Sequence, residues 1–149
     1  MPVDPPIATY VVCGPLFDTT GSVRDALVVL PGRPPGTPED AVEAIFFLQD
    51  AHEARGYVQI FRPEHLVSVT RASDELVIDL SRGVTTINNL STAAMARMVI
   101  ASFLASALSD PTIERVTIMV TSSPQAFCRL LERVEDCNPF TREDLVALT

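Results

Sequence analysis

The chain has 149 residues, enough for one domain with a hydrophobic core, and 47% of them are hydrophobic, which argues against disorder over most of its length. The formal net charge is −8, and the eleven basic residues are all arginines scattered along the chain. An acidic surface without a basic cluster repels phosphate backbones and anionic lipid headgroups, so nucleic acid and membrane surfaces are excluded as expected partners.

Neither a membrane span nor a signal peptide is expected. The most apolar run, Ala93 to Leu108, is shorter than the roughly 20 residues of a spanning helix and contains Arg97. The first residues, Met1 to Asp4, lack the basic start and apolar core of a leader. This pattern fits a cytoplasmic protein and equally an extracytoplasmic one whose leader has been removed.

The N-terminal part predicts an extended lead-in and two strands. Residues 1–7 contain three prolines, which favour an extended chain. β-Branched and aromatic residues predict strands at 8–13 and 26–30. Four prolines and two glycines at 31–38 then indicate a stiff connector.

A helix is predicted to follow the connector. Thr37-Pro38-Glu39-Asp40 is a typical helix start, with a capping threonine, a proline in the first turn and two acids at the positive end of the dipole. Apolar residues at helical spacing extend this helix to Gly56. Residues 57–61 are expected to form a short strand or an extended approach.

The middle of the chain predicts a hairpin and a buried helix. Two strand-like runs, 66–71 and 75–80, are separated by only three residues, so a tight antiparallel hairpin is the simplest arrangement. Residues 81–90 are polar and predict a loop. The helix expected at 91–108 is apolar nearly all round apart from Arg97, so it should lie between the sheet and either the C-terminal segment or a second subunit.

The C-terminal part predicts one more strand and two helices. Alternating residues at 114–121 indicate a strand with one drier face. Ser123-Pro124 begins a helix that Asn138-Pro139 ends, and Thr141 to Asp144 looks like the capping box of a last short helix. The expected fold is therefore α+β, with a small mixed, mostly antiparallel sheet and two helices packed on it. The order is β-β-α-β-β-α-β plus a C-terminal helical tail.

Several of these stretches together resemble the GerMN domain of bacterial sporulation, germination and cell-envelope proteins. The most specific part is Leu66-Val-Ser-Val followed by Leu76-Val-Ile-Asp-Leu-Ser81, which is similar to the family's hairpin. The family often has glycine after the last strand, where this chain has Thr121-Ser122, and Gly-Pro after the first helix, where it has Gln49-Asp50. Further matching stretches are residues 8–12, 27–30 and 38–48, the Ala-rich helix, and residues 110–120.

The resemblance implies a GerMN-like α+β domain at 8–121, preceded by the lead-in 1–7 and extended by the helical segment 122–149. It further implies a non-enzymatic, extracytoplasmic binding or assembly module of an envelope or sporulation-related protein, often within a lipoprotein and without cofactor or metal. The expected partner is an envelope protein or a cell-wall-related ligand. The alternatives are a cytoplasmic regulatory or subunit-pairing domain, which self-associates through the apolar helix or a sheet edge, and a small thiol-dependent enzyme.

The densest cluster of uncommitted hydrogen-bonding side chains follows the hairpin. If the domain has a binding site, we expect it here, with an ordinary polar loop as the alternative. Asp79 is expected to cap the turn 81–83 through its carboxylate, or else to orient the loop or contact a ligand. Ser122-Ser123 could receive an anion or simply cap a helix. The predicted binding residues are Arg82, Thr85, Thr86, Asn88 and Asn89.

The three cysteines show no metal-binding spacing with either histidine, His52 or His65. A single disulfide is expected to join Cys13 to one of the C-terminal pair, because Cys128 and Cys137 would lie about 13 Å apart along a continuous helix. Those two cysteines could pair with each other only if the helix ends early. Unpaired thiols are the alternative. A catalytic Cys–His pair would need one cysteine to meet a histidine in space, and nothing in the spacing indicates this.

Overall fold

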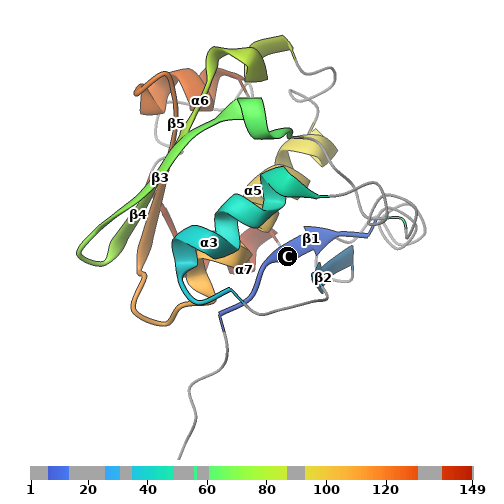
Figure 1. Ribbon diagram of the computed structural model, residues 1–149, viewed down its shortest axis with the longest axis vertical. Helices are drawn as coiled ribbons and strands as arrows, with labels where there is room; N and C mark the ends of the chain where they lie inside the picture. The colour runs from blue at the N-terminus through green and yellow to red at the C-terminus, as the bar shows by residue number, and fades with distance from the viewer. Residues whose placement is uncertain are drawn as a thin grey trace, which may run out of the picture.

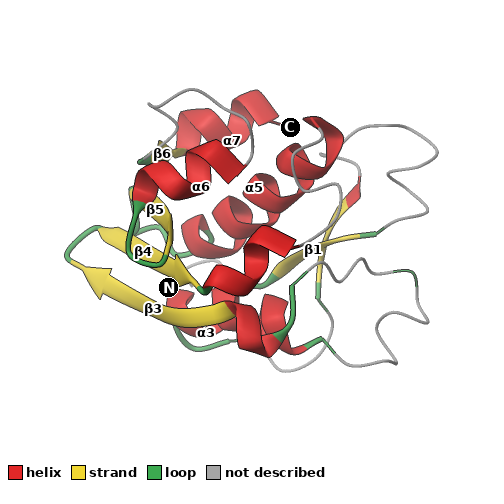
Figure 2. Cartoon of the chain, turned by 90° about the horizontal axis from the view of Figure 1, so that it is seen from above, coloured by secondary structure: helices red, strands yellow, loops and turns green. Residues whose placement is uncertain are grey.

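The computed structural model describes residues 7–13, 26–30, 35–48, 56, 61–86, 93–130 and 139–148 (Figures 1 and 2). Its elements are β1 (Tyr10–Val12), β2 (Leu27–Val29), α3 (Pro38–Glu43), η1 (Ala44–Phe47), η2 (Pro63–His65), β3 (Leu66–Ala72), β4 (Glu75–Leu80), η3 (Arg82–Thr86), α5 (Ala93–Leu108), β5 (Arg115–Val120), α6 (Pro124–Leu130), β6 (Phe140–Thr141) and α7 (Arg142–Leu148). The predicted α+β fold and its order of elements are confirmed. Within these ranges, no helix has the length and apolar character needed to cross a bilayer.

The main sheet has four strands in the order β3-β4-β5-β6. The predicted hairpin is confirmed, since β3 and β4 pair antiparallel with Val69 opposite Ile78. β4 and β5 pair in parallel, with Ile78 beside Ile118, because η3 and α5 form the crossover that a parallel pair requires. β6 adds a short antiparallel pair that the sequence did not predict, in which Phe140 lies opposite Val116.

Helix α5 forms the centre of the core. It contacts α3, α7, β1 and β5, so the predicted sandwich is made within one chain (Figure 1). Each fully buried Leu, Ile or Phe side chain contributes about 1.5–3 kcal/mol through burial. The main sheet contributes Leu76, Ile78, Leu80, Val116, Ile118 and Val120, and the helix contributes Ile100, Phe103, Leu104 and Ala107.

The first helix is shorter than predicted. Its start is as expected, because Thr37 Oγ1 accepts a hydrogen bond from the Asp40 N–H at 3.1 Å. The α-helix ends at Glu43, however, and the chain then tightens into η1 before Leu48 adopts an extended backbone. Phe46 is thereby buried against two other phenylalanine rings, and this aromatic packing outweighs the helical periodicity.

Two further expectations change at the ends of these elements. The apolar residue Phe47 fits the predicted helical face but is 59% exposed. Phe61, the last residue of the predicted strand 57–61, lies outside any strand, and residues 57–60 lie outside the described part. The predicted loop 81–90 contains a short 3-10 helix, η3.

Strands β1 and β2 form a separate two-stranded ribbon. The other edge of β1 rests on α5 through serines spaced along one helix face. The Ser102 hydroxyl donates to the Tyr10 carbonyl at 2.7 Å, and the Tyr10 N–H donates to Ser106 Oγ at 2.9 Å. Ser109 Oγ exchanges hydrogen bonds with the N–H and carbonyl of Ala8 at 3.0 and 3.1 Å. These hydroxyls take the place of a neighbouring strand.

Candidate functional site

Three of the five predicted binding residues belong to η3. The Thr85 hydroxyl donates to the Arg82 carbonyl and the Thr86 hydroxyl donates to the Gly83 carbonyl, each at 2.8 Å. Both threonines therefore already use a hydroxyl within the 3-10 turn. Arg82 is exposed and forms no ion pair with the described part of the chain. Asn88 and Asn89 lie outside the described residues, so a binding role for this cluster stays a prediction.

η3 is held against η2 by a set of short hydrogen bonds. The Ser81 N–H donates to the His65 carbonyl at 2.7 Å, and the Ser81 hydroxyl donates to the Glu64 carbonyl at 2.8 Å. The Arg62 N–H donates to His65 Nδ1 at 3.0 Å, which requires an unprotonated Nδ1. A Cβ added at Gly83 would lie 3.3 Å from His65 Cδ2, so only glycine fits this contact comfortably. The histidine therefore has a packing role at this junction.

Asp79 caps a turn other than the predicted one. Its carboxylate accepts hydrogen bonds from the Ser122 N–H at 2.9 Å and the Ser122 hydroxyl at 3.0 Å. The expectation that it caps the turn 81–83 is wrong, because the parallel pairing of β4 and β5 places Asp79 beside Met119 and within reach of the turn after β5. In that turn Thr121 and Ser122 have φ of 48° and 65°, the left-handed region that favours glycine.

The two remaining predicted helix starts are formed by side-chain caps. The Ala126 N–H donates to Ser123 Oγ at 3.2 Å at the start of α6, which confirms the capping interpretation of this serine. The Thr141 N–H donates to the Asp144 carboxylate at 2.7 Å, as in a capping box at the start of α7.

The cysteines do not pair as expected. Cys13 is a half-buried free thiol, and its N–H donates to the Ala26 carbonyl within the ribbon. Cys128 is buried and disulfide-bonded, so the expected bond between Cys13 and a C-terminal cysteine is wrong. Cys137 and His52 lie outside the described residues. In the ranges that the structure describes, no three His, Cys, Asp or Glu side chains gather as a metal site.

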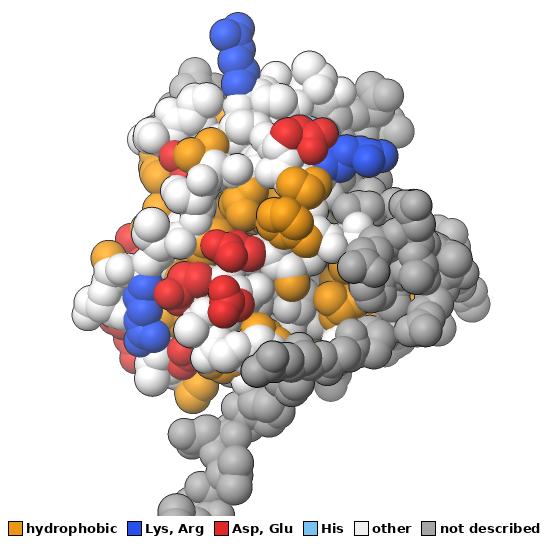
Figure 3. Space-filling model, in the orientation of Figure 1, with side chains coloured by type: hydrophobic (Ala, Val, Ile, Leu, Met, Phe, Trp, Pro, Cys, Tyr) orange, Lys and Arg blue, Asp and Glu red, His pale blue; other side chains and the backbone are white. Residues whose placement is uncertain are grey.

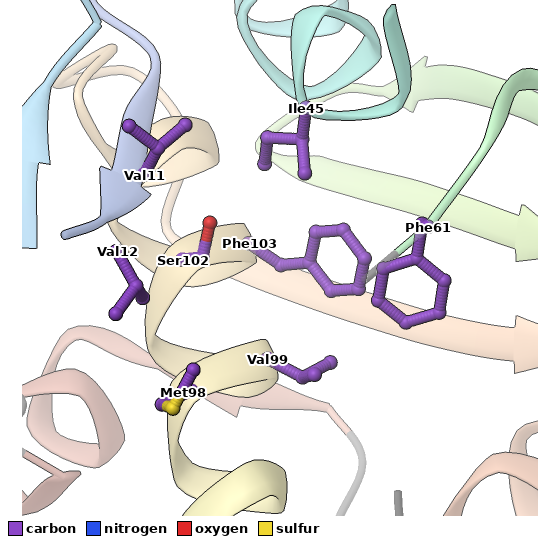
Figure 4. A pocket seen from close by; sticks show the side chains of 8 residues that line it. All are labelled: Val11, Val12, Ile45, Phe61, Met98, Val99, Ser102 and Phe103. Carbon is purple, nitrogen blue, oxygen red and sulfur yellow. The ribbon is translucent and has the colours of Figure 1, made fainter. Parts of the chain in front are cut away.

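A groove that was not predicted from the sequence lies between the β1–β2 ribbon, α5 and α7. Its volume is about 380 Å³, within the range typical of small-molecule pockets. Its polar lining comes from Tyr10, Ser109 and Arg142. The aliphatic lining comes from Leu27, Ala105, Leu108, Leu145 and Val146. A second space, between β1, η1 and α5, measures only about 20 Å³, about the size of one water, so it has no room for a ligand (Figure 4).

The helical wall of the groove is fixed by two arginines that cap each other's helix. Arg97 near the start of α5 donates to the Leu148 carbonyl at the end of α7 at 3.2 Å. Arg142 at the start of α7 donates to carbonyls at and beyond the end of α5. These belong to Leu108 at 2.9 Å, Asp110 at 3.2 Å and Ile113 at 2.8 Å. Each guanidinium meets the negative end of the other helix, which locks the two helices together.

Asp110 supplies a fixed negative charge behind this clamp. Partial burial raises the pKa of its carboxyl. Hydrogen bonds from the Thr112 hydroxyl and N–H and the charges of Arg71 and Arg142 lower that pKa, and together they outweigh the effect of burial. The net pKa is below the ordinary value of 3.8. Asp110 is therefore ionised at neutral pH and is engaged by Thr112 and Arg71.

Acidic side chains gather on the face that α3 presents (Figure 3). Burial, followed by repulsion from Asp40 and Glu39, raises the pKa of Glu43 above its ordinary value of 4.5. One carboxylate oxygen of Glu39 is enclosed without a hydrogen-bond partner. Partial burial first, and the neighbouring acids second, therefore disfavour the charged form of Glu43.

Comparison with known proteins places the fold. No protein-family model matches the chain, and no curated protein is significantly similar to it in sequence. A solved structure, the first GerMN domain of the sporulation protein GerM from Bacillus subtilis, is similar with a TM-score of 0.52 over 78% of this chain and 81% of that one. The sequence identity is 11%, so the likeness is one of fold. It confirms the resemblance found in the sequence: this chain has a GerMN-like α+β fold.

Proposed function

We propose that the chain is a non-enzymatic, extracytoplasmic binding or assembly module of a bacterial cell envelope or sporulation-related protein, anchored as part of a lipoprotein. The observation that carries the proposal is the structural likeness to a GerMN domain of a sporulation protein. The disulfide at Cys128 supports an extracytoplasmic place, because disulfides persist in oxidising compartments.

Local geometry favours binding over catalysis at the residues first considered. The Thr85 and Thr86 hydroxyls donate within their own turn, and His65 Nδ1 accepts a backbone hydrogen bond. Cys128 has no thiol that could act as a nucleophile, since it is disulfide-bonded. Arg82 is left as an exposed cation, which suits contact with a partner's acidic group or hydrogen-bond acceptor.

The location is tested by labelling Cys13, the free, half-buried thiol. The full-length protein in its own bacterium is treated with a membrane-impermeant maleimide, before and after lysis. We expect Cys13 to be labelled in spheroplasts with an intact membrane, and a Cys13→Ser variant to stay unlabelled. Labelling only after lysis would place the chain in the cytoplasm and contradict the proposal.

The contact surface is tested by site-specific photo-crosslinking in cells. A photoreactive residue at Arg82 or Thr85 is expected to give a discrete adduct with an envelope component. The same residue at Thr70, which is exposed on β3, serves as the matched control. Equal adducts from Thr70 would contradict a partner bound at η3.

A cytoplasmic pairing domain is the second candidate, and one feature favours it. β3 is an edge strand of the main sheet, and Val67 on it is 59% exposed. The apolar helix offers no such surface, since α5 is buried from Met98 to Leu108. A concentration-dependent dimer in light scattering that a Val67→Lys substitution abolishes would favour this candidate.

A further inference from the structure

We propose that the groove between the β1–β2 ribbon, α5 and α7 binds a small amphipathic molecule, an unbranched aliphatic chain that ends in a carboxylate. The inference goes beyond the proposed function and does not depend on it. It uses three features of the groove: its aliphatic walls, its lack of free backbone groups along β1, and a cation with unused donors.

The walls of the groove are aliphatic and partly open to water. Val146 lines it and is 74% exposed, and Leu145 and Leu27 beside it are half-buried. Val29, opposite Tyr10 in the ribbon, extends this apolar surface and is 53% exposed. Covering these side chains with a hydrocarbon removes apolar surface from water, which is favourable in proportion to the area covered.

Backbone groups on both edges of β1 are already hydrogen-bonded, which leaves little pairing for an extended peptide. On one edge the Thr9 carbonyl and the Cys13 N–H bond to the segment that contains β2. On the other edge the backbone groups of Tyr10 bond to serines of α5, and those of Ala8 bond to Ser109 just after that helix. A peptide lying in the groove would leave its own N–H and C=O groups unpaired against aliphatic walls, which is costly. A hydrocarbon chain has no such groups.

Arg142 supplies the complementary charge, and it is the one charged side chain among the described residues that line the groove. A guanidinium has five N–H donors, and three hydrogen bonds go to backbone carbonyls, which leaves two. Arg142 is exposed as a residue, and within the described part of the chain no hydrogen bond uses the other two donors. A carboxylate accepts charge-assisted hydrogen bonds from such donors.

Two other groups at the groove support the same head group. The Tyr10 hydroxyl forms no hydrogen bond with the described residues and can donate to an oxygen. Asp110 interacts with the charge of Arg142 but is also hydrogen-bonded by Thr112, and Asp144 is hydrogen-bonded by Thr141. A carboxylate therefore meets donors there, whereas a quaternary ammonium would meet like charge.

The test is isothermal titration of the whole protein with hexanoate, octanoate and decanoate, all below their micelle concentrations. We expect affinity to rise up to about fourfold for each added methylene until the groove is filled. Octyltrimethylammonium, which has the same chain and the opposite charge, is expected to bind at least about tenfold more weakly than octanoate. Absence of binding, equal affinity for the two charges, or affinity independent of chain length would overturn the proposal.

Charge substitutions at Val146 locate the site without disturbing the fold, because this side chain is largely exposed. Val146→Glu should weaken octanoate binding about tenfold, and Val146→Lys should strengthen it. Val67→Glu, an exposed valine on β3, is the matched control and should change nothing. If Val67→Glu weakened binding as much as Val146→Glu, the groove would not be the site.

Two further measurements test the role of Arg142 and whether the ligand is a free carboxylate or a membrane lipid. Arg142→Gln should weaken octanoate but not octanol binding. Because this arginine also holds α5, the fold of the Arg142→Gln variant is checked by circular dichroism. If that variant does not fold, the Val146→Glu and Val146→Lys variants test the site instead. Phosphatidylglycerol vesicles should not bind, and vesicle binding without octanoate binding would overturn the proposal. A negative result would leave the extracytoplasmic proposal standing, because Cys13 labelling tests that separately.

Discussion

The two β ribbons of this molecule are held in place by different means. The β3–β4 hairpin joins β5 through a continuous backbone ladder, and Leu76, Ile78 and Leu80 on it belong to the main core. In the β1–β2 ribbon, β1 has a backbone ladder on one edge only, and the hydroxyls of Ser102 and Ser106 of α5 and of Ser109 just after it hold the other edge. The hairpin therefore builds the core, whereas the ribbon depends on a few side-chain atoms and forms one side of the groove.

The largest effect is expected in the hairpin. Ile78→Ala removes a fully buried side chain from the centre of β4 and should lower the free energy of unfolding by about 2–5 kcal/mol. The change is measured by denaturant unfolding. Val77→Ala, on the opposite and half-buried face of the same strand, is the matched variant and should cost clearly less. Equal losses would contradict the assignment of the core to one face.

A smaller but more local effect is expected in the ribbon. Ser106→Ala leaves the Tyr10 N–H without its acceptor in a site where Ser106 is fully buried, at a cost of about 1–3 kcal/mol. The Tyr10 amide should exchange its hydrogen with solvent faster than in the unchanged protein. The Ile78 amide should still exchange only through global unfolding, so its rate should change only as much as the global stability does. Parallel changes at both amides would show that the ribbon and the hairpin open as one unit.

The turn after β5 should be improved by glycine. Thr121 has a φ of 48°, which costs an L-residue about 1–2 kcal/mol. Glycine avoids this cost, but it loses more conformational entropy on folding, which offsets part of the gain. Thr121→Gly is therefore expected to raise the free energy of unfolding by up to about 1 kcal/mol. Thr117→Gly, within strand β5, should lower it. A loss with Thr121→Gly would contradict the strain argument.

The smallest effect concerns the acidic face of α3. Burial and the neighbouring acids raise the pKa of Glu43, so the folded state holds its proton more tightly than the unfolded state. Ionised Glu43 thus lowers stability above the folded-state pKa, and this penalty disappears as pH falls through that pKa. Glu43→Gln should raise stability at pH 7 by about 0.2–0.5 kcal/mol, the range of like-charge pairs on helices. No such gain should appear at pH 3, and thermal unfolding at the two pH values checks both.

The hairpin and the helix starts were predictable because their signals are local. Two β-branched runs around a short turn define the hairpin, and Thr37 with Pro38 defines the start of α3. The partner of Asp79 was not predictable, because it depends on the parallel register of β4 with a strand that lies far along the chain.

The groove was hidden for a similar reason. It combines four segments, which contribute Tyr10; Leu27; Ala105, Leu108 and Ser109; and Arg142, Leu145 and Val146. The serines that hold β1 lie in, or directly after, a helix whose average composition is apolar, so the sequence indicated only a buried helix. Their spacing of four and three residues was the one available signal, since it places all three on the same helix face.

The most direct test of the claim that the β1–β2 ribbon forms one side of a ligand groove is to map the changes in backbone amide chemical shifts as octanoate is added. If the groove beside the ribbon is the ligand site, saturable shifts should cluster at Tyr10, Ser109 and Val146 and leave Arg82 and Thr86 unchanged. Shifts confined to η3, or no saturable shifts, would contradict it.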